Sequence, residues 1–419
     1  MKLSAFGEQF TEQSGILSLM NDLGNALAGN NDIIMMGGGN PAHLPRVEEV
    51  FSQRLNRILS NQKEFTRFIG TYDSPAGEQD FRQELAAMLK RRFGWNLSRH
   101  NICLTHGSQS AFFMLFNAFA GKNRQGLHRR IQLPVTPEYI GYANSGIEQD
   151  IFTAEKPEFE FIDEHTFKYR INFDALDITE DIAALCVSRP TNPTGNVLTD
   201  GEIEHLNMLA RQHDIPLIID GAYGQPFPNL IFTDATPYWN EHIILCLSLS
   251  KLGLPATRTG IVIANEEVIS TIASMNAIIN LAPNSSGALL ALDMIRDDSI
   301  MSLSNQYIRP WYSERMKMAT DYLKKQIGGG LPWYMHKPEG AMFLWLWFRD
   351  LPISSLGLYE RLKKRGVLTV SGHHFFFGAD SNWQHRYECL RVTFTCDTEE
   401  TVRKGLAIIA DEVRHLYND

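Results

Sequence analysis

The sequence is poor in the residues that build disulfide or metal frameworks. It has five cysteines in 419 residues, none of them in a C-x-x-C spacing. Three of the five lie inside apolar runs, where a reduced thiol behaves as a small hydrophobic side chain. We therefore expect core cysteines in a reducing, cytoplasmic protein rather than a disulfide-rich or cysteine-ligated domain.

Long hydrophobic runs and targeting signals are also missing. No stretch approaches the roughly 20 apolar residues that a membrane-spanning helix needs. The first 20 residues lack the apolar centre of a signal peptide, and Glu8 and Glu12 interrupt them. We expect no membrane partner.

The charge pattern excludes a second class of partner. The 39 basic residues are scattered among 48 acidic ones, and the net charge is −9. No basic cluster marks a nucleic-acid surface, so we expect no nucleic-acid partner. The pair His373-His374 has no third ligand nearby in the sequence, and we expect no metal.

What the sequence does contain is an alternation of apolar runs and helical segments. Apolar runs predict strands at 101–105, 182–188, 216–220, 242–247 and 260–264, and helices are predicted at 108–120 and 199–213. Thr199 and Glu202 form a capping box at the start of the second helix. Runs that are apolar throughout and separated by helices are typical of an α/β fold with a mostly parallel sheet buried on both faces.

The pattern changes after about residue 300. Strands are predicted at 341–348 and 390–394, further apart in the sequence. A final amphipathic helix places its apolar residues at spacings of 4, 3, 4 and 3, namely Val402, Leu406, Ile409, Val413 and Leu416. Because the chain is too long for one ordinary domain, we predict a large domain at 46–300 and a smaller α+β domain at 301–419. We expect the segment 1–45 to contribute to the small domain and to the substrate loop.

Lys251 is the first candidate for chemistry. It ends the tetrapeptide Ser248-Leu249-Ser250-Lys251, which follows a predicted strand. A solvated surface lysine is one interpretation. Alternatively, a pocket can lower the pKa of the amine and free it as a nucleophile. Two serine hydroxyls and the nearby Arg258 would suit a phosphate group.

Two further candidates follow predicted strands. Asp220 stands at the carboxyl end of the strand 216–220, at the ligand-binding edge of an open sheet. It is either a turn residue or the counter-ion of a protonated ring nitrogen. The run Asn192-Pro193-Thr194-Gly195 is either a common Asn-Pro turn or a constrained backbone facing a ligand, with a cis bond left open.

Two glycine-containing turns complete the set. Gly107-Ser108-Gln109 lies between a strand and a helix, where free N–H groups form an anion site or Ser108 is simply a cap. The run from Gly37 through Gly39 to Pro41 permits close backbone approach or is a flexible turn. It does not match G-x-G-x-x-G, so a dinucleotide fold is not expected.

Taken in order, these residues resemble the fold-type I, class I/II aminotransferases, which depend on pyridoxal 5′-phosphate. The resemblance runs from Gly39 to Arg391. The separations from Asn192 to Asp220 (220 − 192 = 28) and from Asp220 to Lys251 (251 − 220 = 31) fit the family. The resemblance implies an α/β fold with a mostly parallel, seven-stranded type of sheet, and a Schiff base between the cofactor and Lys251.

The resemblance also implies a role for each residue. Catalytic roles fall to Lys251, Asp220 and Tyr223. Cofactor contacts fall to Tyr72, Gly107, Ser108, Gln109, Tyr139, Asn192, Asp220, Tyr223, Ser248, Ser250, Lys251 and Arg258. Substrate contacts fall to Gly39, Asn192 and Arg391, of which Arg391 would grip the α-carboxylate. Tyr72 would reach the active site of a neighbouring subunit, which implies a homodimer.

Substrates are the last expectation. The runs SRPTNPTGNV, PEYIGYA, SLSKLGLP and HKPEGAMFLWLWF are similar to members that exchange the amino group of valine or alanine with pyruvate or 2-oxoisovalerate. This implies a ping-pong transaminase. The alternatives are another range of neutral or aromatic amino acids, or a β-lyase on the same fold. A regulator with an aminotransferase-like domain carries an amino-terminal helix-turn-helix domain, and only 38 residues precede Gly39, so we expect an enzyme.

Overall fold

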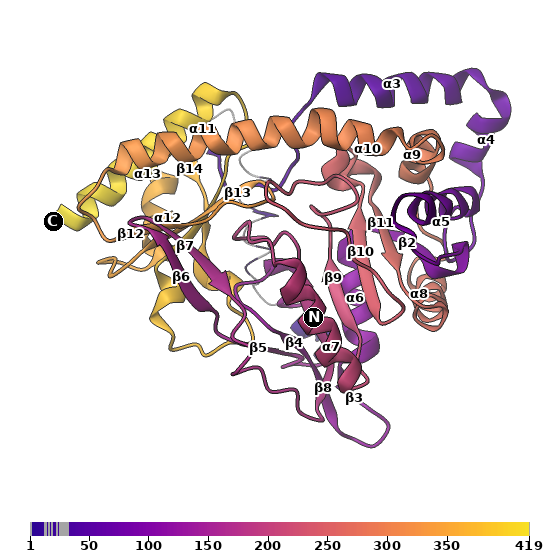
Figure 1. Ribbon diagram of the computed structural model, residues 1–419, viewed down its shortest axis with the longest axis horizontal. Helices are drawn as coiled ribbons and strands as arrows, with labels where there is room; N and C mark the ends of the chain where they lie inside the picture. The colour runs from indigo at the N-terminus through magenta and orange to yellow at the C-terminus, as the bar shows by residue number, and fades with distance from the viewer. Residues whose placement is uncertain are drawn as a thin grey trace.

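The computed structural model describes residues 2–11, 15, 17, 20, 21, 24 and 33–418. Part of the predicted segment 1–45 therefore lies outside the described residues. Two large sheets stand beside each other, and a long helical rod that contains α11 runs across both of them (Figure 1).

The larger sheet has eight strands in the order β2-β11-β10-β9-β8-β4-β3, with β5 beside β4. Strands β10, β9, β8, β4 and β5 are parallel to their neighbours in this set, whereas β11 is antiparallel to both β10 and β2. The mostly parallel sheet is thereby confirmed. The strand bounds are β2 Ile102–His106, β3 Gly121–Lys122, β4 His128–Leu133, β5 Phe152–Ala154, β8 Ile182–Ser188, β9 Leu217–Asp220, β10 Ile243–Ser248 and β11 Thr259–Ile263.

The central strands of this sheet, β8, β9 and β10, are buried at every residue, which explains why they are almost entirely apolar. Cys186 and Ile218 face a core that contains residues of α6 (Gly107–Phe119) and α8 (Glu266–Ile279). Their neighbours along the strands, Val187 and Ile219, face a second core with α7 (Asp200–Gln212) and α5 (Gln79–Phe93). The five cysteines, all within the described residues, are free thiols, and four of them are buried.

The predicted capping box explains where α7 begins. The Thr199 hydroxyl accepts a hydrogen bond from the Glu202 N–H at 3.2 Å, and the Glu202 carboxylate accepts one from the Thr199 N–H at 2.7 Å. Two N–H groups of the first turn are thus paired. Since α7 is the crossover between β8 and β9, its start also fixes the length of the loop that carries Asn192.

The second sheet has six strands in the order β15-β16-β13-β12-β7-β6. Its bounds are β6 Glu158–Asp163, β7 Thr166–Arg170, β12 Trp333–His336, β13 Phe343–Phe348, β15 Val370–Ser371 and β16 Cys389–Thr393. Strands β13 and β16 were predicted, but β6 and β7 come from the middle of the chain. A two-stranded pair joins β1 (Ile34–Met35) to β14 (Val367–Leu368). The division at residues 45 and 300 stays a prediction.

The remaining helices flank the two sheets. Helix α11 packs against α13, whose apolar residues Val402, Leu406, Ile409, Val413 and Leu416 are all buried, as predicted. Among the described residues, no helix is long and apolar enough to cross a membrane. The bounds are α1 Ala5–Gln9, α3 Pro45–Ser60, α4 Gln62–Gly70, α9 Ser286–Arg296, α10 Ser299–Leu303, a π-helical turn Ser304–Ile308, α11 Arg309–Ile327, α12 Ser355–Lys364 and α13 Glu399–Asn418.

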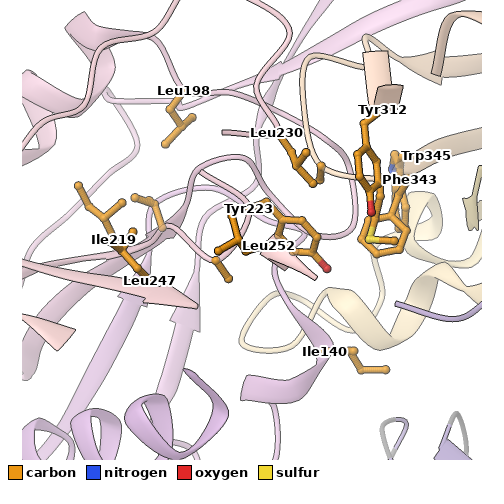
Figure 2. Packing of buried hydrophobic residues seen from close by; sticks show 14 of the residues in the cluster. Ile140, Leu198, Ile219, Tyr223, Leu230, Leu247, Leu252, Tyr312, Phe343 and Trp345 are labelled. Atoms are coloured by element: carbon orange, nitrogen blue, oxygen red, sulfur yellow. The ribbon is translucent and has the colours of Figure 1, made fainter. Parts of the chain in front are cut away.

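The core continues from one sheet to the other. Tyr223, from the loop after β9, lies beside Phe343 of β13 with ring centroids 6.0 Å apart. Tyr312 of α11 and Trp345 of β13 lie in the same region (Figure 2). This junction places loops of the large sheet against strands of the small one.

Candidate active site

A cavity of about 230 Å³ lies where the loops after β8, β9 and β10 meet strand β16 of the second sheet. Met20, Asn40, Ile140, Ser188, Pro190 and Ala222 contribute to its wall. Twelve of the fourteen predicted site residues line this cavity. They are Gly39, Ser108, Gln109, Tyr139, Asn192, Asp220, Tyr223, Ser248, Ser250, Lys251, Arg258 and Arg391. The other two, Tyr72 and Gly107, do not line this cavity.

Lys251 lies in the 3₁₀ turn Ser250–Leu252 that follows β10. Its ammonium nitrogen donates a hydrogen bond to the Gly39 carbonyl and lies 5.2 Å from the centroid of the Tyr223 ring. Burial, together with the Arg391 and Arg258 guanidinium groups, lowers the pKa of Lys251 to about 8. Near neutral pH, a larger fraction of this amine is therefore uncharged than of an ordinary solvent-exposed lysine. A nucleophile or general base must be uncharged to react.

Asp220 ends β9 and is held by two donors. Its carboxylate accepts a hydrogen bond from the Tyr142 hydroxyl at 2.5 Å and from the Ala222 N–H at 2.9 Å. Burial raises the pKa of Asp220 to about 6, against the lowering effect of these two donors and of Lys251. The hydrogen bonds and the nearby ammonium group thus favour the carboxylate form at neutral pH.

Tyr142 was not predicted as a site residue. It follows Tyr139 by three positions in the 3₁₀ turn Ile140–Tyr142, and its ring packs against Phe112 and Phe116. Burial raises the pKa of Tyr142 well above its ordinary value, so the hydroxyl keeps its proton and can only donate to Asp220. The one signal in the sequence was the second tyrosine of PEYIGYA, which does not reveal its partner 78 residues away.

Tyr142→Phe should move the acid limb of the kcat/KM profile to higher pH. If activity needs the Asp220 carboxylate, it falls as the pH drops through the pKa of that group. Loss of a hydrogen bond to a charged group costs about 1.5 kcal/mol or more, which raises that pKa by about one unit. The measurement is kcat/KM for transamination across the acid range. Tyr169→Phe, which removes another buried tyrosine hydroxyl, bonded to His385, should leave the limb in place, and an unmoved limb in Tyr142→Phe would contradict this role.

Arg391, on β16, is held between two aromatic rings and two acceptors. Its guanidinium carbon lies 4.2 Å from the centroid of Phe343 and 5.2 Å from that of Phe375. It donates to the Asn192 side-chain oxygen and to the Gly37 carbonyl, both at 2.7 Å. Its Nε is buried and has no hydrogen-bond partner among the described residues. A carboxylate would satisfy that donor.

Glycines allow the start of α6 to approach Arg258. Gly107 has φ +77°, and a Cβ there would lie 2.4 Å from a guanidinium nitrogen of Arg258. A Cβ on Gly260 would lie 2.6 Å from the Ser108 nitrogen. With the hydroxyls of Ser248 and Ser250 on the same wall, the helix N-terminus and the guanidinium form a donor set that fits a phosphate group.

Backbone constraints surround the Asn192 and Tyr139 segments. The cis bond left open near Asn192 is found at Arg189–Pro190, and Asn192–Pro193 is not among the cis bonds of the described chain. The Gln109 side chain donates to the Gly141 carbonyl at 2.7 Å and so ties α6 to the turn after Tyr139. The Tyr139 ring lies edge-on to Tyr142, with centroids 5.2 Å apart.

Tyr72 lies outside the cavity of its own chain, and its side chain is 83% exposed. The loop that carries it is anchored by Asn276, which donates to the Pro75 carbonyl at 3.0 Å, and by Ser285, which donates to Asp73. Its contact with a neighbouring subunit stays a prediction.

The rings of His373 and His374 lie against each other at an interplanar angle of 38°, with centroids 3.9 Å apart. His373 shares a hydrogen bond with the Ser371 hydroxyl at 2.8 Å, and burial lowers the pKa of His373 to about 4. In the described part of the chain, no group of three or more His, Cys, Asp or Glu side chains is arranged to hold a metal ion.

The chain belongs to the class I and II aminotransferases, since the model of that family matches residues 34–409. It is therefore a pyridoxal 5′-phosphate-dependent aminotransferase with the fold-type I architecture. It is 46% identical to the valine–pyruvate aminotransferase of Escherichia coli (strain K12) over 417 residues, which cover 100% of this chain and 99% of that protein.

Solved structures agree with this assignment. The crystal structure of valine–pyruvate aminotransferase from Salmonella typhimurium LT2 is 44% identical, covers 96% of this chain and 100% of its own, and has a TM-score of 0.88. Aspartate aminotransferase from Thermus thermophilus, at 20% identity and a TM-score of 0.78 with 98% of this chain and 100% of its own covered, shares the fold.

The residues around the cavity fit the cofactor of this family. Lys251 offers an amine of lowered pKa for an aldehyde, and Asp220 offers a buried carboxylate for a ring nitrogen. The Gly107 and Gly260 backbone, where a Cβ would collide with Arg258 or α6, leaves a cradle of donors for the phosphate.

Proposed function

We propose that this aminotransferase moves the amino group between a small aliphatic amino acid, valine or alanine, and pyruvate or 2-oxoisovalerate, by a ping-pong mechanism. The observation that carries the proposal is the composition of the cavity wall. Among the described residues of that wall, the cations are Lys251, Arg258 and Arg391.

Each of these three cations is assigned to the cofactor or to the substrate α-carboxylate. No cation of the described wall therefore remains to bind a charged substrate side chain. Lys251 is the amine and Arg258 lies beside Gly107 at the phosphate cradle, so Arg391 is left for the α-carboxylate. The rest of the wall includes the apolar residues Met20 and Ile140. A neutral, apolar side chain is therefore favoured over a carboxylate, which would be buried without a partner. The full-length similarity to valine–pyruvate aminotransferase supports the same substrates.

We propose the following roles toward the cofactor. Ser108, Gln109, Ser248, Ser250 and Arg258, with the Gly107 backbone, would hold the phosphate. Tyr139 would lie on the ring, and Asn192 and Tyr223 would donate to the phenolic oxygen. Asp220 would hold a proton on the ring nitrogen. When bound, pyridoxal 5′-phosphate supplies an electron sink for the bond broken at the substrate Cα.

The protein's own groups do the rest. Arg391 binds the α-carboxylate, and with Asn192 and Gly39 it fixes the direction of the substrate Cα–H bond. Lys251 would take the proton from the substrate Cα as general base and, as general acid, deliver it to the cofactor carbon that receives the amino group. Its lowered pKa suits both directions of that transfer.

A panel of amino donors tests the substrate proposal. With 2-oxoisovalerate as acceptor, alanine should exceed aspartate and glutamate in kcat/KM by at least about 30-fold, because a buried unpaired charge costs about 2 kcal/mol or more. Valine should exceed them to the same extent with pyruvate as acceptor. The matched control is asparagine against aspartate, which differ in charge but hardly in size. Equal rates for aspartate and alanine would contradict the proposal. Ammonia and pyruvate released from cysteine derivatives, with no amino acid product, would indicate a β-lyase instead.

We also propose that the enzyme works in the cytoplasm as a homodimer. Free, mostly buried cysteines support a reducing compartment. The exposed Tyr72 lies on a loop anchored to the segment that carries Ile278 and Leu281, which are 86% and 60% exposed. An exposed apolar patch of this kind favours a subunit contact, through which Tyr72 would reach the second active site.

A further inference from the structure

A buried ion pair lies directly behind the loop that carries Asn192. Lys168 of β7 and Glu339, from the segment before β13, are 3% and 4% exposed and lie 2.5 Å apart. The same Glu339 oxygen accepts a hydrogen bond from the Val197 N–H at 3.3 Å, and the Lys168 ammonium donates to the Val197 carbonyl at 3.0 Å. The pair therefore binds both polar backbone groups of Val197.

The loop between β8 and Val197 is closed on itself. Thr191 N–H donates to the Asn196 carbonyl and Gly195 N–H donates to the Thr191 carbonyl, both at 2.8 Å. Gly195 has φ +71°, and a Cβ there would lie 2.7 Å from the Gly340 carbonyl. The Glu339 N–H also donates to the Gly195 carbonyl at 3.2 Å. These contacts connect Val197 to Asn192 through the backbone of one closed loop.

Asn192 and Arg391 come from different sheets, and Glu339 joins the two. It lies four residues before β13, which begins at Phe343, and β13 pairs with β16 so that Trp345 faces Arg391. Glu339 thus connects the backbone of the Asn192 loop to the strand beside Arg391. Inside the cavity, Arg391 donates a hydrogen bond to the Asn192 side-chain oxygen at 2.7 Å.

We propose that Glu339, paired with Lys168, is a positioning residue that sets Asn192 against Arg391 and so acts on transamination from outside the cavity. A buried ion pair is a poor device for stability alone, because apolar residues of similar size often serve as well. The two charged side chains bind the N–H and the carbonyl of the same residue, Val197, and so hold the loop in one backbone conformation. The inference rests on the role proposed above for Asn192.

A double-mutant cycle tests the inference in the full-length enzyme loaded with cofactor. Glu339→Gln should lower kcat/KM by about 10- to 100-fold, the scale of a misplaced contact, without a matching loss of bound cofactor. In an Asn192→Ala background the same substitution should lower kcat/KM by less than about 2-fold, because the residue it positions is already gone. If Glu339→Gln does not fold, Lys168→Met/Glu339→Gln leaves no unpaired buried charge and is compared in both backgrounds instead.

The control is Lys337→Ala. The Lys337 ammonium contacts the other Glu339 oxygen at 2.9 Å but is 45% exposed, so its removal should leave kcat/KM within about 2-fold. Equal losses in both backgrounds would mean that Glu339 contributes only to general stability, and would overturn the inference. Normal activity in a folded Glu339→Gln enzyme would do the same. Normal activity in Asn192→Ala would contradict the role proposed for Asn192 and, with it, the inference about Glu339, but not the proposed substrates.

Discussion

Lys251→Ala is expected to lose at least about 10²- to 10⁴-fold in kcat for transamination, the usual contribution of a positioned general base. The amine lies in the cavity, and its pKa is lowered to about 8. Among the described residues that line the cavity, Lys251 is the only lysine. The measurement is single-turnover and steady-state transamination of alanine with 2-oxoisovalerate by the wild type and the variant.

Added methylamine distinguishes a loss of proton transfer in Lys251→Ala from damage to the fold. A small amine that enters the space left by the side chain should restore part of the rate, and the rescue should grow with its concentration. Lys156→Ala removes an exposed lysine paired with Asp380 and should change nothing. Near-normal transamination by Lys251→Ala would contradict the assignment of Lys251.

Asp220→Asn is expected to lose about 10³-fold in kcat. The substitution keeps an acceptor for the Tyr142 hydroxyl but removes the charge that would hold a proton on the ring nitrogen. Two unit charges about 4 Å apart interact by about 4 kcal/mol at an effective dielectric of 20, which corresponds to about 10³ in rate. The measurement is kcat together with the absorbance spectrum of the bound cofactor, which should differ from the wild type.

Asp220→Glu is the matched control, since it keeps the charge and lengthens the side chain. It should keep more activity and more of the wild-type spectrum than the asparagine variant. An asparagine variant as active as the wild type would show that the ring nitrogen needs no anionic partner in this enzyme.

The fold was predictable where a strand is buried on both faces. The run 182–188 coincides with β8, and the alternation of Cys186 and Val187 between two cores explains why positions 182–187 are all apolar. Strand β6 escaped prediction for the opposite reason. It is an edge strand in which Glu158 and Glu160 are exposed to solvent. Because it packs little against the core, it lacks the continuous apolar run by which the buried strands were predicted.

The site residues could be predicted where they belong to motifs that follow one another in the same order as in the aminotransferase family. Lys251, Asp220 and Arg391 lie together around the cavity, although 171 residues (391 − 220) separate Asp220 from Arg391. Tyr142 and Glu339 could not be found in this way. Each acts through one partner that folding brings close, Asp220 for Tyr142 and Val197 for Glu339, and neither contact leaves a local pattern in the sequence.

Attachment of the cofactor to Lys251 is the claim on which the other roles depend. The most direct measurement is reduction of the purified enzyme with borohydride, which fixes the cofactor to its lysine, followed by proteolysis and mass spectrometry of the peptides. We expect a pyridoxyl group on the peptide that contains Lys251. A pyridoxyl group on another lysine, with the Lys251 peptide unmodified, would contradict it.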